Sequence, residues 1–547
     1  MGFLRLKSYK AASARQRSMS TGWRDINNDA GGRRPERPLH VQRDPSLHVL
    51  SVERSPITKG DTMKRSSRVT GAATGLALVW CCAQADVKDP LPDSLSLGGV
   101  TLYATIDVGY AFQSKGVPLS SQYIDGLEYQ AFTTTRNFAG SQSTIAESGL
   151  EQSKIGIRVS EPITGDFTLV ARTDTGFNPL SGQLADACGS IATNGGKAQG
   201  TQTTNADSSR CGQPFNGVIW GGASHPLYGT LTIGRQQSLQ LDALALYDPQ
   251  TLSYAFSFLG YSGFNGGAGS TEGARWDNSV KYAFVRGPVR VSGMYSNGGQ
   301  DTGLIGKSYG ADVGATLYGL SVDFVYENEK GAVNLRSAFD DIPNPLNPVP
   351  TAANPFPTVG LQAYISNDTS YNLMGKYTFE LGGSGPKDKL TLYAGYSHIQ
   401  KAHSEYTGVG DSSQGNYPLV IDINVNSSAV YNMEWFGARY ALSSGWNFTG
   451  ALYHVIQNSW TIGLGPSGHD NIGCYDAGLL CAGAFKEASF VTDYIINKHY
   501  DVYGGVNWSE VTDGLANGFP GTSAAPNGGT YGSENQTTFM FGLRIKI

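Results

Sequence analysis

Hydrophobic and polar residues alternate along the last eleven residues of the chain, 537–547. Phe539 and Phe541 share one parity, whereas Thr538 and Arg544 share the other. Successive side chains of a β-strand point to opposite faces, so this pattern predicts a strand with one apolar and one polar face. In a soluble sheet such a strand at an edge would invite aggregation, but a closed membrane barrel has no edge. The pattern therefore favours a barrel that crosses a membrane.

The same alternation recurs along the chain and predicts sixteen strands. They lie at about 100–110, 153–160, 167–174, 216–224, 230–236, 278–286, 289–296, 309–317, 320–328, 371–381, 389–398, 430–441, 446–457, 488–495, 500–510 and 537–547. Short turns alternate with long loops at 112–152, 175–215, 237–277, 297–308, 329–370, 399–429, 458–487 and 511–534. An even number of strands, with short periplasmic turns and long external loops, is typical of bacterial outer-membrane barrels.

Charged residues fall on the polar parity of many of these segments. Arg158 lies in the second segment, Arg172 in the third, and Asp323 and Lys376 in two later ones. Burying an unpaired charge is costly, so these side chains would not fit the core of a β-sandwich, but they can line a water-filled lumen. The sequence therefore predicts an all-β fold, a 16-stranded antiparallel transmembrane β-barrel with long external loops.

The first 85 residues have a different pattern. A basic stretch at 63–68 precedes an uncharged apolar run at 69–82 and the small-x-small sequence Ala83-Gln-Ala85. These features predict a signal peptide at 63–85, cleaved before Asp86, because a spanning helix would need about 20 apolar residues. Residues 1–62 are rich in Arg, Ser and Pro and have no periodicity, so we interpret them as a start-site extension or a disordered arm. The barrel would then occupy 86–547.

Charge excludes one class of partner. The whole chain has a net charge of -5, and the excess of basic residues before Asp86 leaves about −14 for the remainder. Nucleic-acid binding needs a basic surface, so no nucleic-acid partner is expected.

Six cysteines are present, and two of them fall in the predicted signal peptide. Cys188 and Cys211 lie in one polar loop, and Cys474 and Cys481 lie in another. In an exported protein this distribution predicts two disulfides, each within one loop, although the pairing rests on proximity alone. A zinc site is the less favoured alternative, because no further Cys or His cluster supports it.

The sequence contains no catalytic motif that we recognise. The pattern G-x-S-x-G occurs at Gly306–Gly310, but a nucleophile elbow needs a helix after the serine, and the alternation predicts a strand at 309–317 instead. His398, His403 and Glu405 lie close together and could bind a metal, but solvated polar residues at a strand end are the favoured interpretation. We therefore expect no enzymatic activity, no cofactor and no metal.

Five blocks, taken in order, resemble the trimeric general diffusion porins of Gram-negative outer membranes. They are Val100–Tyr103, Ser153–Glu161, Phe215–Gln236, Asp277–Tyr282 and Phe541–Arg544. The resemblance implies a homotrimer embedded in outer-membrane lipid. It also implies passive diffusion of small hydrophilic solutes and ions through a water-filled, charge-lined pore.

In that family the third external loop folds into the barrel and narrows it, with acidic loop residues facing basic wall residues. Here that loop is about 237–277. The resemblance implies Asp242, Asp248 and Glu272 as acidic candidates and Arg158, Arg172, Arg235 and Arg275 as basic candidates. Arg235 shares parity with Leu231 and Ile233, so a β-bulge or a strand end would have to turn it inward. Alternatively, each arginine is an ordinary lumen charge and each aspartate accepts loop-stabilising hydrogen bonds.

Three other functions stay open at this point. One is a substrate-specific channel for sugars or carboxylates, a second is a non-conducting surface adhesin or receptor, and a third is a barrel enzyme. The sign of ion selectivity is also open. The acidic net charge favours cations at the mouths, where salt screens it, whereas the arginines favour anions at the narrowest point.

Overall fold

The computed structural model describes twelve stretches of the chain. These are 95–114, 141–185, 213–261, 275–298, 307–337, 361–382, 386–403, 423–459, 461–464, 472–473, 482–513 and 533–547. The chain divides into the units Met1–Asp86 and Val87–Ile547, and all described residues belong to the second. The predicted extension at 1–62 and signal peptide at 63–85 lie outside the described residues, as do Glu272, Cys188, Cys211, Cys474 and Cys481, so these predictions stay predictions.

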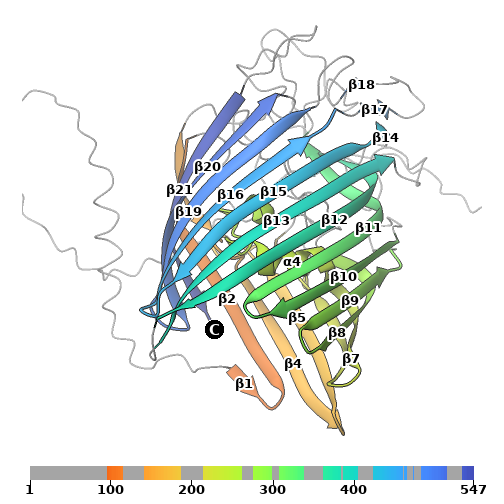
Figure 1. Ribbon diagram of the computed structural model, residues 1–547, viewed down its shortest axis with the longest axis vertical. Coiled ribbons are helices and arrows are strands. Elements are labelled where there is room, and N and C mark those ends of the chain that lie inside the picture. Colours follow the sequence, from red (N-terminus) through yellow and green to blue (C-terminus); the bar gives the residue numbers. More distant parts are fainter. Residues whose placement is uncertain are drawn as a thin grey trace, which may run out of the picture. The chain divides into compact units, whose positions relative to one another are not determined.

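Most described residues belong to one antiparallel sheet (Figure 1). Its strands are β1 (Leu95–Leu97), β2 (Val100–Gln113), β3 (Gln142–Glu147), β4 (Lys154–Thr164), β5 (Phe167–Gly176), β6 (Ile219–His225), β7 (Gly229–Gln237), β8 (Arg275–Arg286), β9 (Val289–Ser296), β10 (Ser308–Leu317), β11 (Leu320–Ser337), β12 (Leu361–Leu381), β13 (Asp388–His403), β15 (Ala429–Ala441), β16 (Trp446–Gln457), β19 (Gly483–Ile495), β20 (Tyr500–Asp513) and β21 (Ser533–Lys546). A separate small sheet contains β14 (Ile423–Ser427), β17 (Thr461–Leu464) and β18 (Ile472–Gly473).

The large sheet closes on itself, because β21 pairs with β20 on one side and with β2 on the other. On its other edge β2 pairs with two strands in succession, since β4 covers 100–105 and β3 covers 108–113. These two strands share one position in the ring, and β1 is a three-residue flap folded onto the start of β2. The 18 strands therefore form a closed barrel of sixteen positions, which confirms the predicted fold class. Closure joins β21 to β2, so the described wall does not end in an open edge strand.

The two faces of the wall follow the parity of the sequence. In β21, Phe541 is 56% exposed on the outer face, whereas Met540 is 0% exposed and points inward. Phe539 and Thr538 differ in the same way. The predicted division into an apolar outer and a polar inner face is confirmed for this strand.

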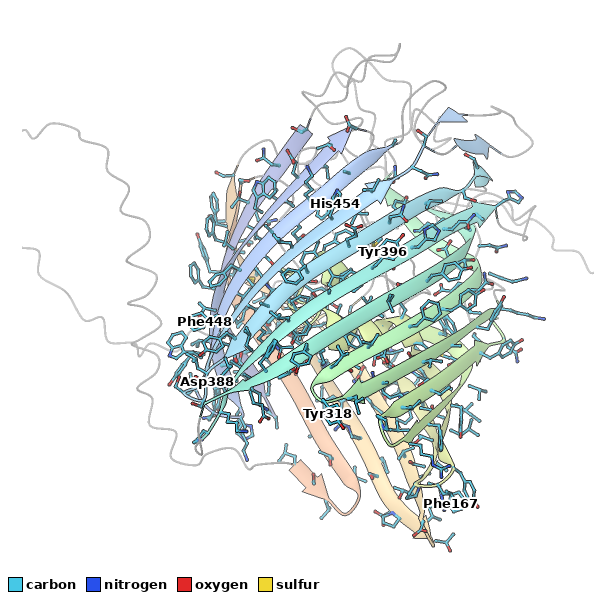
Figure 2. All side chains as sticks on the ribbon, viewed as in Figure 1. Phe167, Tyr318, Asp388, Tyr396, Phe448 and His454 are labelled. Atoms are coloured by element: carbon cyan, nitrogen blue, oxygen red, sulfur yellow. The ribbon has the colours of Figure 1, made fainter. Side chains whose placement is uncertain are left out.

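Aromatic side chains gather where the strands meet the short turns. Phe167, Tyr318 and Phe448 lie at this end of the outer wall (Figure 2), and the rings of Trp446 and Phe448 stack with centroids 6.2 Å apart. The outer wall between this end and the long loops exposes apolar side chains such as Phe436, Leu452 and Phe490. An apolar band bordered by aromatic residues is the surface that a barrel presents to lipid.

Two differences from the predicted strands have local causes. The predicted loop at 329–370 is shorter, because β11 continues to Ser337 and β12 begins at Leu361. A register shift between Glu329 and Ala332 interrupts the alternation there and hides the continuation. The second difference is β3, which lies inside the predicted loop at 112–152 and contains a single large apolar residue, Ile145.

Two helices follow β7, namely α4 (Leu239–Tyr247) and α5 (Phe258–Tyr261). Ser238 caps α4, because its side chain accepts a hydrogen bond from the backbone N of Leu241. None of the helices in the described part of the chain is long and apolar enough to cross a membrane.

Candidate pore constriction

Helix α4 packs against the inner face of the wall. The backbone N of Gln240 donates to Glu327 Oε1 at 3.0 Å, and its side-chain Nε2 donates to Asn372 Oδ1 at 3.0 Å. Tyr247 shares a hydrogen bond of 2.8 Å with Ser321. These wall residues belong to β11 and β12 and have the parity opposite to the exposed outer residues of the same strands. The third long loop therefore folds into the barrel, as the resemblance implied.

Beyond α4 the loop continues along the inner wall to β19 and β20. Gln250 Nε2 donates to Ser489 Oγ at 2.9 Å, and the backbone N of Phe258 donates to Glu487 Oε1 at 2.9 Å. Asn507 Nδ2 donates to the carbonyl of Ala255 at 3.2 Å. The segment 238–261, which we call the inner loop, thus runs from β11 to β20. In the ring of sixteen positions, β4 and β5 lie opposite β12 and β13, so they face the inner loop across the lumen.

Asp248, a predicted constriction residue, is fully buried at the end of α4. Its carboxylate accepts hydrogen bonds from Tyr453 Oη at 2.6 Å, Ser257 Oγ at 2.7 Å and the backbone N of Leu252 at 2.6 Å. Burial raises the pKa of this carboxyl, although these donors oppose the rise. Asp248 thus has no surface facing solvent. Its surroundings fit the alternative interpretation, in which the aspartate accepts hydrogen bonds that stabilise the loop.

Arg158 and Arg172 lie opposite each other on β4 and β5. The ring of Tyr103 lies beside both, with its centroid 5.5 Å from Arg158 Cζ and 5.8 Å from Arg172 Cζ. Arg172 also pairs with Asp174 at 2.8 Å. Arg158 is exposed and has no carboxylate partner among the described residues. One positive charge of this pair is therefore not compensated there.

Arg235 and Arg275 are both buried. The register shifts between Gly234 and Gln236, so the β-bulge that parity required is present. Arg235 then pairs with Asp277 at 2.6 Å and donates to the carbonyl of Gly217 at 3.0 Å. Arg275 begins β8 opposite Gln237. Unlike Arg158, these two arginines are therefore not exposed.

Asp242 is the exposed acid on the described part of the inner loop, with 43% of its side chain accessible. Its partner is Lys281 of β8, a wall residue that was not among the predicted basic candidates. Parity could have identified Lys281, because Val280 and Tyr282 on either side of it are exposed on the outer wall. An acidic loop residue does face a basic wall residue here, but that residue is not one of the predicted arginines.

Three further basic residues beneath the inner loop were not among the predicted constriction residues, although Lys376 was predicted to line the lumen. Arg290 of β9 pairs with Asp323 at 2.6 Å and donates to Tyr247 Oη at 2.8 Å. Lys376 of β12 and Arg439 of β15 contact the inner loop directly. Each lies on the inner parity of its strand, so alternation placed them in the lumen without showing that the loop would reach them.

A closed barrel with an apolar outer wall, a charged inner wall and an inner loop defines a channel protein of the outer membrane. The family model described as Gram-negative porin matches residues 72–459, more than half of the chain. The chain therefore belongs to the Gram-negative porin family and is an outer-membrane porin.

Solved structures of such proteins are similar to the chain at low identity. The anion-selective porin from Comamonas acidovorans is 14% identical, with 82% of this chain and 99% of that chain covered and a TM-score of 0.48. OmpT of Vibrio cholerae, folded in vitro, is 10% identical, with coverages of 83% and 100% and a TM-score of 0.45. The channel DcaP of Acinetobacter baumannii is 12% identical, with coverages of 82% and 100% and a TM-score of 0.44. The comparison with curated protein sequences gave no match.

Proposed function

We propose that this porin is a passive, water-filled diffusion channel for small hydrophilic solutes and ions, and that its narrowest part favours anions. The observation that carries this proposal is the uncompensated, exposed charge of Arg158 on the wall that faces the inner loop. The acids of the described inner loop are engaged, because Asp248 is buried and Asp242 pairs with Lys281. A fixed charge acts most strongly where the aqueous path is narrow, so it outweighs screened charges at the mouths.

Transport of this kind makes and breaks no bond. The proposal therefore assigns Arg158, Arg172 and Asp242 an electrostatic effect on passing ions, and it assigns no catalytic residue, metal or cofactor. The solutes are selected by size and by charge.

The proposal also includes assembly and export. We infer a homotrimer from the resemblance stated above, and removal of residues 1–85 during export from the pattern at 63–85. Chemical cross-linking of the purified protein tests the trimer, and N-terminal sequencing tests cleavage before Asp86. The same preparation, with and without reduction, tests disulfides within the pairs Cys188–Cys211 and Cys474–Cys481.

Reconstitution of residues 86–547 in a planar bilayer tests the channel itself. Across a KCl gradient we expect stepwise openings and a reversal potential of the sign that chloride permeation gives. Replacing both wall arginines, Arg158→Gln with Arg172→Gln, should move that potential toward the value for cations. Arg286→Gln is the matched control, because this exposed arginine ends β8 on the outer parity.

A folded and inserted protein that passes no current would overturn the diffusion channel and favour the surface receptor among the alternatives. A reversal potential that does not change when Arg158 and Arg172 are replaced would overturn the role assigned to them. It would not contradict the diffusion channel.

A further inference from the structure

The inner loop presents apolar side chains to the lumen. Helix α4 buries Ala243, Leu244 and Tyr247 against the wall but leaves Leu246 48% exposed. An exposed leucine in a water-filled passage gains no burial energy in the empty channel, so a ligand that covers it would gain that energy.

The backbone just beyond Leu246 is held in an unusual conformation. Thr251 and Leu252 have φ values of 55° and 59°, in the left-handed region that residues other than glycine rarely adopt. Asp248 maintains this turn, because it accepts the hydrogen bond from the backbone N of Leu252. Strained conformations of this kind persist where the surrounding structure fixes them and are concentrated at binding sites. The tip of the loop, Leu246–Leu252, is therefore a rigid surface.

Two basic residues of the wall flank this tip. Lys376 Nζ donates to the carbonyl of Leu246 at 3.0 Å, so the ammonium group lies within reach of the exposed Leu246 side chain. Arg439 Nη2 donates to Thr251 Oγ1 at 3.5 Å and Nε donates to Thr449 Oγ1 at 3.2 Å. Neither cation has a carboxylate partner among the residues that the structure describes. The neighbouring carboxylate of Asp323 is occupied by Arg290.

We propose that Lys376, Arg439 and the tip of the inner loop form a binding site for carboxylates that carry an apolar chain. The two cations would hold the carboxylate through charge-assisted hydrogen bonds, and Leu246 would cover the chain. This inference rests on the proposed diffusion channel and gives that channel a preferred class of solute. Binding at such a half-exposed site is weak, and a transported solute must be able to leave the site.

Block of the KCl current by linear sodium carboxylates, from acetate to octanoate at constant ionic strength, tests the site. The blocking constant should fall about twofold with each added methylene. This factor corresponds to roughly half of the free energy gained when a methylene is buried completely. Leu246→Asn should abolish this dependence on chain length. Leu227→Asn is the matched control, because Leu227 is 60% exposed in the short turn between β6 and β7, outside the lumen, and it should keep the dependence.

The two cations are tested separately from the apolar surface. Lys376→Gln and Arg439→Gln should weaken block by every carboxylate by a similar factor while leaving the dependence on chain length intact. Hexyltrimethylammonium, an apolar cation, should block the unaltered channel less than hexanoate does.

Each contrary result has its own meaning. An open channel whose block does not depend on chain length, or depends on it equally after Leu246→Asn, overturns this site and leaves the diffusion channel standing. Equal block by hexanoate and hexyltrimethylammonium overturns the role of the cations. A protein that is silent in KCl before any carboxylate is added overturns both proposals, because the ligand could not enter the lumen.

Discussion

The two sides of the lumen use their charges differently. On the side of β4 and β5, Arg158 and Arg172 lie around one tyrosine ring, and only Arg172 has a carboxylate partner among the described residues. On the side of the inner loop, Asp248 and Glu327 are buried and accept hydrogen bonds that fix the loop to the wall. Asp248 and Glu327 therefore attach the loop to the wall, whereas Arg158 has no carboxylate partner among the described residues. The net charge of the chain is acidic, yet Arg158, Lys376 and Arg439 are basic residues of the inner wall without a carboxylate partner among the described residues.

The largest effect is expected from Asp248→Ala. This change leaves several buried donors without their acceptor, and we expect a loss of about 3 kcal/mol from the attachment of the loop. Single channels should become noisier and more conductive, because the inner loop no longer stays against the wall. Asp248→Asn keeps the shape but only one of the two acceptor atoms, so its effect should be smaller than that of Asp248→Ala. If the Asp248→Ala channel has unchanged conductance and no added current noise, Asp248 does not hold the inner loop in place.

The next effect separates the two arginines. Arg158→Gln should change the ratio of chloride to potassium permeability about fourfold, because one charge across roughly 10 Å of water changes the energy of each ion by about 0.4 kcal/mol, in opposite directions for the two ions. Arg172→Gln should change it less, because Asp174 already compensates that charge. Reversal potentials of the two variants measure the difference. Equal shifts would mean that Asp174 does not screen Arg172.

A smaller effect is expected at the acidic residue of the inner loop. Asp242→Asn frees the charge of Lys281 and should increase the preference for chloride by less than about 1.5-fold, since a partly exposed pair contributes little. Lys281→Gln should change the reversal potential in the opposite direction. Shifts of the same sign in both variants would show that the pair does not face the conducting path.

The smallest effect concerns pH. Burial raises the pKa of Asp248 in the folded protein, so the folded state binds a proton more tightly than the unfolded state does. The resulting contribution to stability is complete below the unfolded pKa of about 4 and is lost as pH rises through the raised value. Unfolding midpoints in detergent should therefore fall with rising pH for the unaltered protein relative to Asp248→Asn. Parallel profiles would contradict the raised pKa.

The wall could be predicted from the sequence, because its signal is local. A period of two residues decides which side chains face lipid, and antiparallel neighbours joined by a short turn bring Arg158 opposite Arg172. Even the β-bulge at Arg235 follows from a conflict of parity between that arginine and Leu231 and Ile233. The alternation failed where a bulge or a lack of large apolar residues interrupted it, at the end of β11 and in β3.

The interior of the constriction was decided by tertiary structure. Asp248 accepts a hydrogen bond from Tyr453, which lies 205 residues further along the chain. Asp242 forms its ion pair with Lys281 rather than with an arginine. No period in the sequence encodes where on the ring the inner loop comes to rest. That position depends on the fit of α4 against β11 and β12, and it determines which acids are buried as hydrogen-bond acceptors and which bases pair with an acid.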